Sequence, residues 1–569
     1  MYIQYCTSKQ NGKTYTYPLL CRKYRESGKI KTEVVANLTK FPKETLLAIE
    51  SALKKNKDIL VSLKDIIIKK SIDYGFVYVL LTIMDRLRIT EALEKVLGDR
   101  AKFVKLMVLG KIITRGSKLC IFNWINRNEE IAQKLGININ DLKLETLYSV
   151  LADLSHVQDK VERKWNLYHK SEKDEVYLYD ITSSYFEGAE NELAAYGYNR
   201  DGKKGKKQIV IGLITNKEGF PLGIEVFEGN TNDHKTVIEQ LKKIKAGYEV
   251  DDVIFVGDRG MRIRYNLEQM GDEERQGIGY ITALSIEEIR CLINEGTLQL
   301  NLFSKDLAEI ENEGGRYVLC TNPDLEKEQS RTRAALKAKF EETMHKIKLS
   351  FDTRLQNNLK NKERLAQGSK NKKLTTQFSE KQLDSYKYRV RAAAEKYHMQ
   401  AFYQATISQD KLIVTFDFEK YAQAKYLDGK YVIVTNVQKE KMPKETIREQ
   451  YKNLKHVEHA FRDMKTTRLD IRPIFHVNED TTRGHVFVTM FAYAIIRELE
   501  NQIYPWLKET KQINKRQLSL KDIEEELKMI KLNVLQINKR HEEIKITELS
   551  VHQKEIFKTL GIKTESLTM

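Results

Sequence analysis

The chain has 569 residues, which is too many for a single hydrophobic core, so two to four domains are expected. Its 97 lysines and arginines exceed its 80 aspartates and glutamates, and the net charge of +17 favours a polyanionic partner, nucleic acid before an anionic membrane. Five scattered cysteines, no signal peptide and no apolar run long enough to cross a bilayer argue against disulfide scaffolds, zinc fingers and membrane proteins, and indicate a soluble cytoplasmic protein.

The N-terminal third predicts a small α+β module followed by helices. In residues 1–70, KTYTYPLL and TEVVANL suggest short strands, and Lys43–Lys70 looks helical. Residues 71–172 predict a helical region that could bind DNA, in which segments such as VYVLLTIMDRLRITEALEKVL have helical periodicity. Basic residues on helices are often only solvated, so a helix-turn-helix here stays an open alternative. It would present three of them to DNA, Arg115, Lys118 and Arg127.

Residues 173–285 predict an α/β core. EVYLYDITSSYF, QIVIGLITN and LGIEVFEG indicate three strands, and a polar, lysine-rich hairpin (197–207) follows the first of them. Asn232–Lys245 and Ile263–Met270 predict helices, and VIFVGDRGM and IGYITAL predict two further strands. The resulting order is three strands, helix, strand, helix and strand, with an antiparallel hairpin sheet on one side.

A domain inserted into this core is predicted over residues 286–437. Its stretch Leu325–Lys373 carries 14 lysines and arginines against 6 acids, which indicates long basic helices that either contact phosphates or are simply solvated. Tyr403–Lys420 and Tyr431–Val437 predict strands.

The chain then returns to the core over residues 438–504. This part begins with a helix whose first residue is Pro443 and includes the apolar helix His485–Leu499. A charged helical tail is expected over residues 505–569.

The helix Met442–Lys465 carries an unusual carboxylate. Tyr451, Glu458 and Lys465 are seven residues apart and share one face, and Glu458 falls on the apolar stripe of the helix. Because burying an unpaired charge is costly, a carboxylate aimed at a core needs a partner. That partner is either Arg462, four residues further on, or a divalent metal ion.

Two aspartates lie on the predicted strands of the core. Asp180 interrupts the first strand, where aspartate is disfavoured, and Asp258 ends the fourth, where it could be only a turn former. If these strands are neighbours, both carboxylates can converge, and Glu458 could join them. Three carboxylates without sulfur or histidine suit Mg²⁺ or Mn²⁺. Two such ions can activate water or a 3′-hydroxyl for attack on a phosphodiester.

Several segments, in order, carry a family resemblance. DITSSYFEG, YGYNRDGKKGKKQIVIGL, EGNTNDHKT, VGDRGM and YKNLKHVEHAFRDMK resemble the motifs of the DDE transposases of bacterial insertion sequences, of the IS-four-like superfamily. The resemblance covers most of residues 1–500. It implies a ribonuclease-H-like core with a large insertion, and a catalytic, metal-binding triad of Asp180, Asp258 and Glu458 that holds Mg²⁺ or Mn²⁺, with two ions expected.

The same resemblance implies residues that bind DNA. The last segment is similar to the signature Tyr-x2-Arg-x3-Glu-x6-Lys, which places Tyr451 and Lys465 on the backbone of the transposon end. Leu454 stands at the arginine position, and Lys455 or Arg462 could supply the missing charge. Further DNA contacts are expected from basic residues in the aspartate motifs and the hairpin, Arg259, Lys203 and Lys204. No tryptophan lies in the insertion to stack on a flipped base, although Tyr431 could do so.

Three functions follow from these features. A transposase would bind terminal inverted repeats as a homodimer, cleave DNA at the element's ends and join the 3′-hydroxyl ends to target DNA. A structure-selective nuclease could use the same fold, and a DNA-binding regulator could keep the fold without activity. Loss of a triad carboxylate would favour the regulator, whereas strand joining would separate transposase from nuclease.

Overall fold

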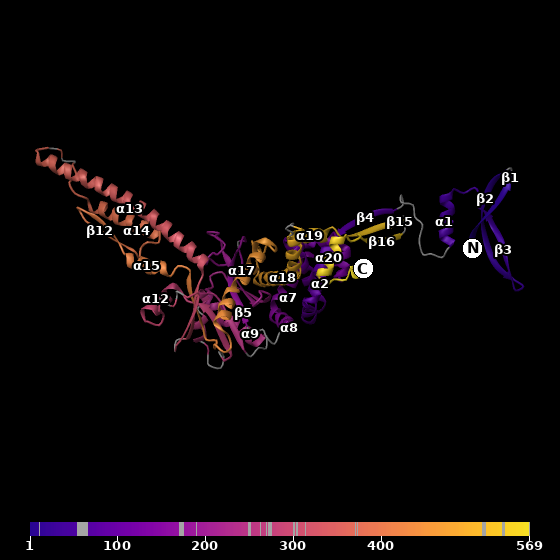
Figure 1. The fold of residues 1–569 in the computed structure, drawn as a ribbon, viewed down its shortest axis with the longest axis horizontal. Coiled ribbons are helices and arrows are strands. Elements are labelled where there is room, and N and C mark those ends of the chain that lie inside the picture. Colours follow the sequence, from indigo (N-terminus) through magenta and orange to yellow (C-terminus); the bar gives the residue numbers. More distant parts are fainter. Residues whose placement is uncertain are drawn as a thin grey trace. The chain divides into compact units, whose positions relative to one another are not determined.

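The structure is a computed structural model in which two compact units are described, shown in Figure 1. One unit comprises Met1–Arg86 with Glu498–Met569, and the other comprises Leu87–Arg497. No helix among the described residues is long and apolar enough to cross a membrane. The described residues are 1–10, 12–53, 66–169, 176–188, 190–247, 252–261, 263–268, 270, 276–299, 302, 305–312, 315–369, 371, 374–514, 519–537 and 541–567.

The first unit contains two separate three-stranded antiparallel sheets. Strands β1 (Tyr2–Gln10), β2 (Lys13–Glu26) and β3 (Lys29–Asn37) form one sheet, which the helix α1 (Lys43–Leu53) follows. The second sheet has the order β16-β15-β4. Its strands and the neighbouring helices are β4 (Ile66–Asp73), α2 (Gly75–Arg86), α19 (Leu520–Lys528), β15 (Lys531–Ile537), β16 (His541–Ile546) and α20 (Val551–Thr559).

This second sheet corrects two of the sequence predictions. Of the helix expected over Lys43–Lys70, the structure describes Lys43–Leu53 as a helix, the prediction for residues 54–65 lies outside the described residues, and residues 66–70 belong to the strand β4 instead. The C-terminal tail is not wholly helical, because β15 and β16 pair in it and β15 also pairs with β4. Residues far apart in sequence complete this sheet, so the local helical pattern of either segment could not reveal it.

The second unit begins with the helical run that the sequence predicts. Trp165, on the last of these helices, is fully buried, and its indole nitrogen donates to the carbonyl of Leu87. The helices are α3 (Ile89–Leu97), α4 (Ala101–Thr114), α5 (Lys118–Asn126), α6 (Glu129–Lys134), α7 (Leu144–His156) and α8 (Gln158–His169).

An eight-stranded sheet forms the centre of the second unit. Its order is β10-β11-β14-β9-β8-β5-β6-β7, with parallel pairing of β5 with β8 and of β8 with β9. The other neighbouring pairs are antiparallel. The strands are β5 (Val176–Tyr185), β6 (Gln208–Asn216), β7 (Pro221–Glu228), β8 (Val253–Val256), β9 (Ile278–Ala283), β10 (Leu307–Asn312), β11 (Gly315–Thr321) and β14 (Lys430–Thr435).

The main hydrophobic core lies on one face of this sheet. Alternate residues of β5, including Tyr179 and Ile181, pack there with side chains from three helices, as the two-residue period of a strand requires. These helices are α9 (Asp233–Gly247), α10 (Ile263–Glu268) and α12 (Ile286–Asn294). The sequence prediction of the strand and helix order from β5 to β9 is therefore confirmed.

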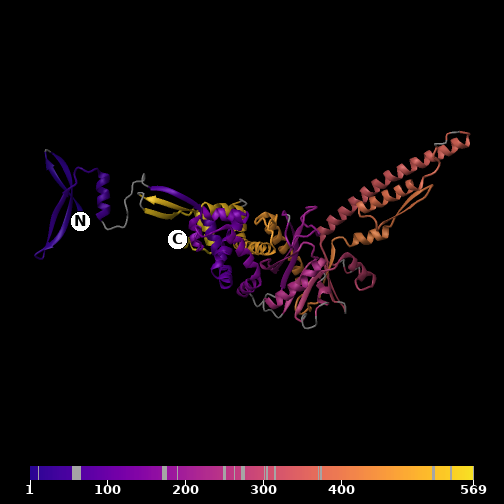
Figure 2. The same ribbon diagram turned by 180° about the vertical axis from the view of Figure 1, so that it is seen from behind.

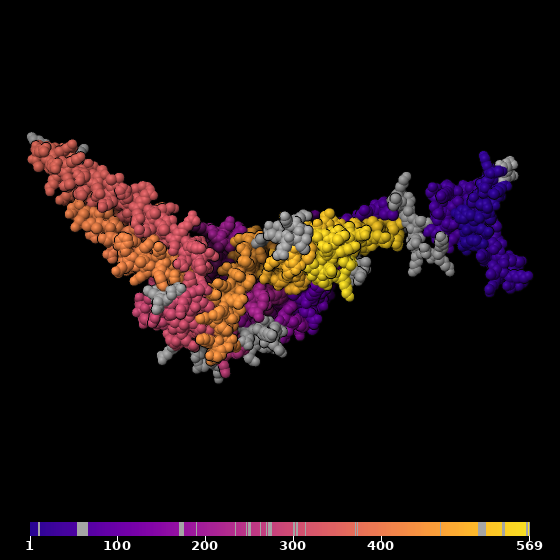
Figure 3. All heavy atoms as spheres, viewed as in Figure 1, coloured from indigo at the N-terminus to yellow at the C-terminus, as the bar shows by residue number. Residues whose placement is uncertain are grey.

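A helical module with its own hydrophobic cluster lies between β11 and β14 in the chain. Phe351 of its first helix is fully buried against Phe378 and Tyr386, and Phe340 of the same helix is fully buried against Tyr403. Figures 1 and 2 show the long first helix beside the second helix and the hairpin, and in Figure 3 the atoms of these segments form two adjacent bands, salmon and orange. The module consists of α13 (Pro323–Ala366), α14 (Glu380–Lys396), β12 (Tyr403–Ile407), β13 (Leu412–Phe416) and α15 (Phe418–Tyr426).

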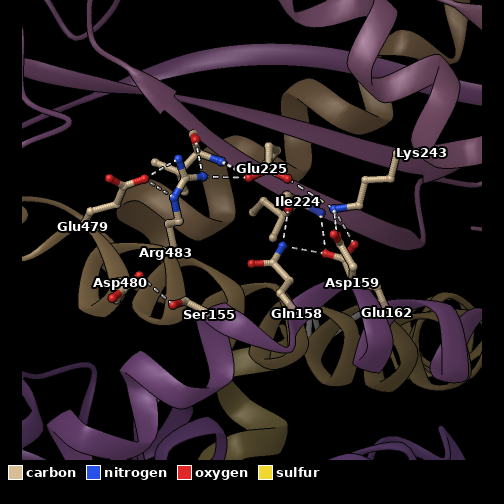
Figure 4. Close-up of polar contacts among 11 residues, drawn as sticks. Ser155, Gln158, Asp159, Glu162, Ile224, Glu225, Lys243, Glu479, Asp480 and Arg483 are labelled. Atoms are coloured by element: carbon tan, nitrogen blue, oxygen red, sulfur yellow. Dashed lines mark hydrogen bonds and ion pairs between the residues drawn. The ribbon is translucent and has the colours of Figure 1, made fainter.

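A buried ion network fixes the helical run to the edge of the sheet (Figure 4). The Lys243 ammonium of α9 lies 2.7 Å from Glu162 of α8, which is 1% exposed, and 3.2 Å from Glu225 of β7. Glu225 also accepts from Arg483 of α18 (Glu479–Asn514). Next to it, a Cβ on Gly484 would lie 2.2 Å from the carbonyl oxygen of Leu151, so only glycine allows α18 to approach α7 this closely.

Candidate active site

The register of the parallel strands brings the two aspartates together. Leu178 of β5 pairs with Val256 of β8, and Asp180 and Asp258 each lie two residues further along the chain. Because side chains alternate along a strand, Asp180 points away from the core that contains Tyr179. The first and fourth strands of the core are neighbours, which is the condition under which the sequence allowed the two carboxylates to converge.

Two helices in sequence cover this second face of the sheet. Helix α16 (Lys444–Lys452) packs on β9, β10, β11 and β14, and α17 (Leu454–Arg462) packs on β5 and β6. The single helix that the sequence predicts is therefore interrupted at Asn453. Pro443 occupies the N-cap position before α16 and is not its first helical residue. The expectation that Glu458 points into a core is also wrong. Its side chain is exposed, while Val457 and Phe461 are buried on α17.

A pocket of about 570 Å³ collects all three carboxylates. Asp180 comes from β5, Asp258 from the turn after β8 and Glu458 from α17. The pocket is lined by five cations against these three acids, so its formal charge is positive. The cations are Arg200, Lys452, Lys455, Arg462 and Lys465.

Asp180, the least exposed of the three acids, has a raised pKa. Burial, and then the charges of Glu458 and Asp258, raise the pKa of Asp180 to about 7. A divalent cation would relieve this repulsion, and a set of three carboxylates is the donor set that Mg²⁺ and Mn²⁺ prefer. The donor chemistry therefore fits a divalent ion. Within the described ranges, however, no three acidic, histidine or cysteine side chains are close enough to form a ready-made metal cluster.

Tyr451 lies directly beside one of the acids. Its hydroxyl donates to Asp258 Oδ1 over 3.4 Å, and its ring stacks on that of Tyr431 with centroids 6.1 Å apart. Burial and the charge of Asp258 raise the pKa of Tyr451. The hydroxyl therefore stays protonated and can donate a hydrogen bond at neutral pH.

Lys465 is a buried member of an ion bridge. The π-helical turn Asp463–Thr467 follows α17 and carries Lys465, which is 9% exposed. Its ammonium lies 2.9 Å from Asp201 Oδ1, and Arg472 approaches the same oxygen to 2.5 Å. Lys465 thus lines the pocket while it is paired with a carboxylate that the sequence did not indicate.

The remaining sequence candidates divide into two groups. Lys455 and Arg462 line the pocket, as Leu454 does. Arg259, Lys203 and Lys204 are exposed but lie outside the pocket lining. The Lys203 ammonium lies 5.7 Å from the centroid of the Tyr185 ring.

Sequence reasoning missed Arg200 and Lys452. The Arg200 guanidinium lines the pocket and holds Asp233 through two hydrogen bonds of 2.6 and 2.8 Å. Its place in the GYNRDGK segment, which follows the first aspartate strand, was the available signal. Lys452, immediately after Tyr451, had no distinguishing pattern.

Comparison with known proteins gives two family matches. Residues 171–495, more than half of the chain, match the family model described as "Transposase DDE domain", and residues 3–60 match "IS1634 family transposase, N-terminal domain". No curated protein sequence matches the chain. One similar solved structure is a piggyBac transposase synaptic complex with hairpin DNA. It has a TM-score of 0.33 and 8% identity and covers 85% of this chain and 75% of that chain, a likeness too weak to support further inference.

Proposed function

The chain belongs to the family of transposase DDE domains of insertion sequences, and we propose that Asp180, Asp258 and Glu458 are its catalytic carboxylates. A transposase of this family is a metal-dependent enzyme that cleaves DNA and transfers its strands. The observation that carries the assignment is that these three acids, from β5, the turn after β8 and α17, line one cation-rich pocket. Each of them also stands in a segment that resembles a motif of the family.

The finer fold assignment rests on the strand order. Three antiparallel strands, β7, β6 and β5, continue into the parallel β8 and β9, and this arrangement supports a ribonuclease-H-like core. The module with its own hydrophobic cluster, α13–α15, would be the inserted domain. The predicted insertion, 286–437, also contains β10, β11 and β14, which belong to the central sheet. The sequence motifs support placement in the IS-four-like superfamily.

Different residues of the pocket would have different roles in phosphodiester chemistry. Asp180, Asp258 and Glu458 would hold Mg²⁺ or Mn²⁺, with two ions expected, which would supply an activated oxygen nucleophile and stabilise the leaving oxygen. Tyr451 orients Asp258 through its hydroxyl. Exposed Lys455 and Arg462, with Arg200, attract and position the phosphate backbone.

The substrate is proposed to be the terminal inverted repeats of the element, followed by target DNA. The net charge of +17 supports a substrate with many phosphates. Joining two element ends to one target calls for two active sites, so a homodimer in the synaptic complex is part of the proposal.

Single isosteric substitutions test the catalytic assignment. Asp180→Asn, Asp258→Asn and Glu458→Gln should each lower cleavage of a labelled element-end duplex by at least about 10³-fold, since each removes a ligand charge. Binding of the same duplex should change less than about threefold. Glu449→Gln, on α16 outside the pocket, is the matched control and should cleave normally. If binding and cleavage fell together in all three variants, the carboxylates would be structural.

Strand joining separates the transposase from a nuclease of the same fold. A pre-cleaved end with a free 3′-hydroxyl should become joined to a supercoiled target plasmid in the presence of Mg²⁺ or Mn²⁺. Cleavage without any joined product, across both metals, would favour the nuclease.

A further inference from the structure

A second pocket, of about 700 Å³, lies beside the first but contains none of the three acids. It is walled by the turn between α4 and α5, by the loop 470–478 and by the start of α18. Tyr148 and His476 contribute ring walls, with centroids 6.0 Å apart, and Phe475 is 66% exposed on the loop. The pocket is large enough for one nucleotide.

Two lysines are buried in this pocket. Lys111 and Lys118 are each 2% exposed, although lysine is almost never fully buried unless it is paired. Lys111 donates to the backbone carbonyl of Asp470 over 3.1 Å. Lys118 lies 3.0 Å from Nδ1 of His485, a ring that is itself buried. Among the residues that the structure describes, neither ammonium forms an ion pair with a carboxylate.

The surrounding charges do not neutralise these lysines. Burial and the charge of Lys111 lower the pKa of Lys118 to about 7, and burial lowers that of Lys111 to about 8. Burial and the two ammonium charges also lower the pKa of His485, which therefore stays neutral and can accept from Lys118. Arg115 and Arg472 also line the pocket, Arg472 is paired with Asp201, and among the described lining residues only Asp470 carries a carboxylate. Such a cavity is costly when empty of anions and would be stabilised by one.

The pocket is connected to the catalytic one by an ion bridge. Arg472 lines this pocket, Lys465 lines the catalytic pocket, and both approach Oδ1 of Asp201. The helix-turn-helix interpretation of the sequence expected Lys118 on a DNA-facing surface. The structure instead buries it at the start of α5, where it lines this pocket.

We infer that the pocket formed by Lys111, Lys118 and His485 binds a phosphate group of a nucleotide in the transposon-end DNA, away from the scissile phosphodiester. The inference rests on the proposed function for the source of the phosphate. Lys118 and Lys111 supply charge-assisted hydrogen bonds to the phosphate oxygens. Tyr148 and His476 border the space that the attached nucleoside would occupy.

Thermal unfolding with small anions tests the site itself. Millimolar inorganic phosphate, against chloride at equal ionic strength, should raise the Tm of the wild-type protein by a few degrees, and a deoxynucleoside 5′-monophosphate should do the same. Lys118→Met should lose this rise without a lower Tm in chloride, because it removes a buried charge. Lys105→Met, on α4 outside the pocket, should keep the rise. Equal rises in wild type and Lys118→Met would overturn the site.

A measurement on the wild type covers the case in which Lys118→Met does not fold. Crystals soaked in tungstate, a heavy tetrahedral anion, should show density within about 3 Å of Lys118 Nζ. Density only at exposed lysines would overturn the site.

DNA binding then tests the source of the phosphate. Lys118→Met should weaken binding of the element-end duplex about tenfold and lower the log–log salt slope by about one. A lost phosphate response with unchanged DNA affinity would show a site for free phosphate and overturn the DNA assignment. Asp180→Asn should keep both the phosphate response and end binding. If the catalytic proposal were wrong, Asp180→Asn protein would still cleave. If the phosphate site were wrong, Lys118→Met would keep the phosphate response, so the two failures are distinguishable.

Discussion

At the scale of single residues, two roles are open to the Tyr451 hydroxyl. It donates to Asp258, and the signature position implies a contact with the DNA backbone. Tyr451→Phe keeps the ring on Tyr431 and removes only the hydrogen bond. We expect cleavage of element ends to slow about tenfold, the value of one hydrogen bond to a charged group, with Tm almost unchanged.

The control for this substitution is Tyr388→Phe, at a ring that is 73% exposed on α14. It should cleave at the wild-type rate. The two roles differ in their dependence on metal. If Tyr451 only orients Asp258, the loss should shrink at saturating Mn²⁺, whereas a lost phosphate contact would persist at every metal concentration.

Lys118 gives the protein a predictable dependence on pH. Its pKa is about 7 in the fold, against 10.5 as its ordinary value, so the unfolded chain binds more protons between these two values. The free energy of unfolding should therefore rise with pH from about 7 to 10. Urea denaturation without phosphate should show this rise to be at least about 1 kcal/mol larger in wild type than in Lys118→Met.

Other groups facing Lys118 do not reverse this sign. Lys111 has a pKa lowered in the same direction, to about 8, and His476, at about 3, and His485 are already neutral. The carboxylate of Asp470 also borders the pocket. A pH profile of Lys118→Met identical to that of wild type would mean that Lys118 is not the titrating group.

The predictability of the site differs from residue to residue. Asp180 was predictable because strand interiors disfavour aspartate, and Asp258 because it follows a strand that, as a neighbour, brings it to the same register. Glu458 was selected for a wrong reason, since the helical stripe placed it in a core and the side chain is exposed. The partnership of Lys465 with Asp201 joins positions 264 residues apart and leaves no trace in local sequence.

At the scale of elements, one lysine joins three of them. Lys243 of α9 forms ion pairs with Glu162 of α8 and Glu225 of β7 (Figure 4). Lys243→Met leaves Glu162 as a buried charge with less compensation. We expect the free energy of unfolding to fall by about 3 kcal/mol, measured by urea denaturation at pH 7.

The double variant Glu162→Gln with Lys243→Met distinguishes lost charge pairing from lost packing. It should recover part of the loss, because no uncompensated carboxylate remains. Lys217→Met, at an exposed pair of 3.8 Å with Glu218, is the matched control and should cost less than about 1 kcal/mol. If Lys243→Met and Lys217→Met lowered the free energy of unfolding equally, burial of Glu162 would not be the cause.

Elements were easier to predict where their pattern was local. The strands and helices from β5 to β9 follow from alternation, apolar runs and caps. The order of the sheet does not, because β14 enters between β11 and β9 after more than a hundred residues of the chain. The interruption at Asn453 was also hidden, since the apolar spacing continues across it.

At the scale of the whole molecule, part of the net positive charge lies on the module α13–α15, where some basic side chains are paired with acids and others are not. Along α13, three exposed cations make no ion pair among the described residues, Lys348, Arg354 and Lys360. In the same module, three others each face an acid within 3.0 Å, Lys346, Lys387 and Arg391. Uncompensated cations release more counterions when they meet DNA phosphates. The unpaired and the paired cations of this module can therefore be compared in two variants that lose the same net charge.

We predict that changing all three unpaired cations to glutamine lowers the log–log salt slope of element-end binding by about two to three, because each neutralised phosphate contributes about 0.9. Changing the three paired cations removes the same net charge and should lower the slope by less than about one, since their acids already screen them. Fluorescence anisotropy between 50 and 300 mM salt measures both slopes. If the two triple variants lost the same slope, only net charge would matter, and α13 would be a solvated helix without a DNA contact.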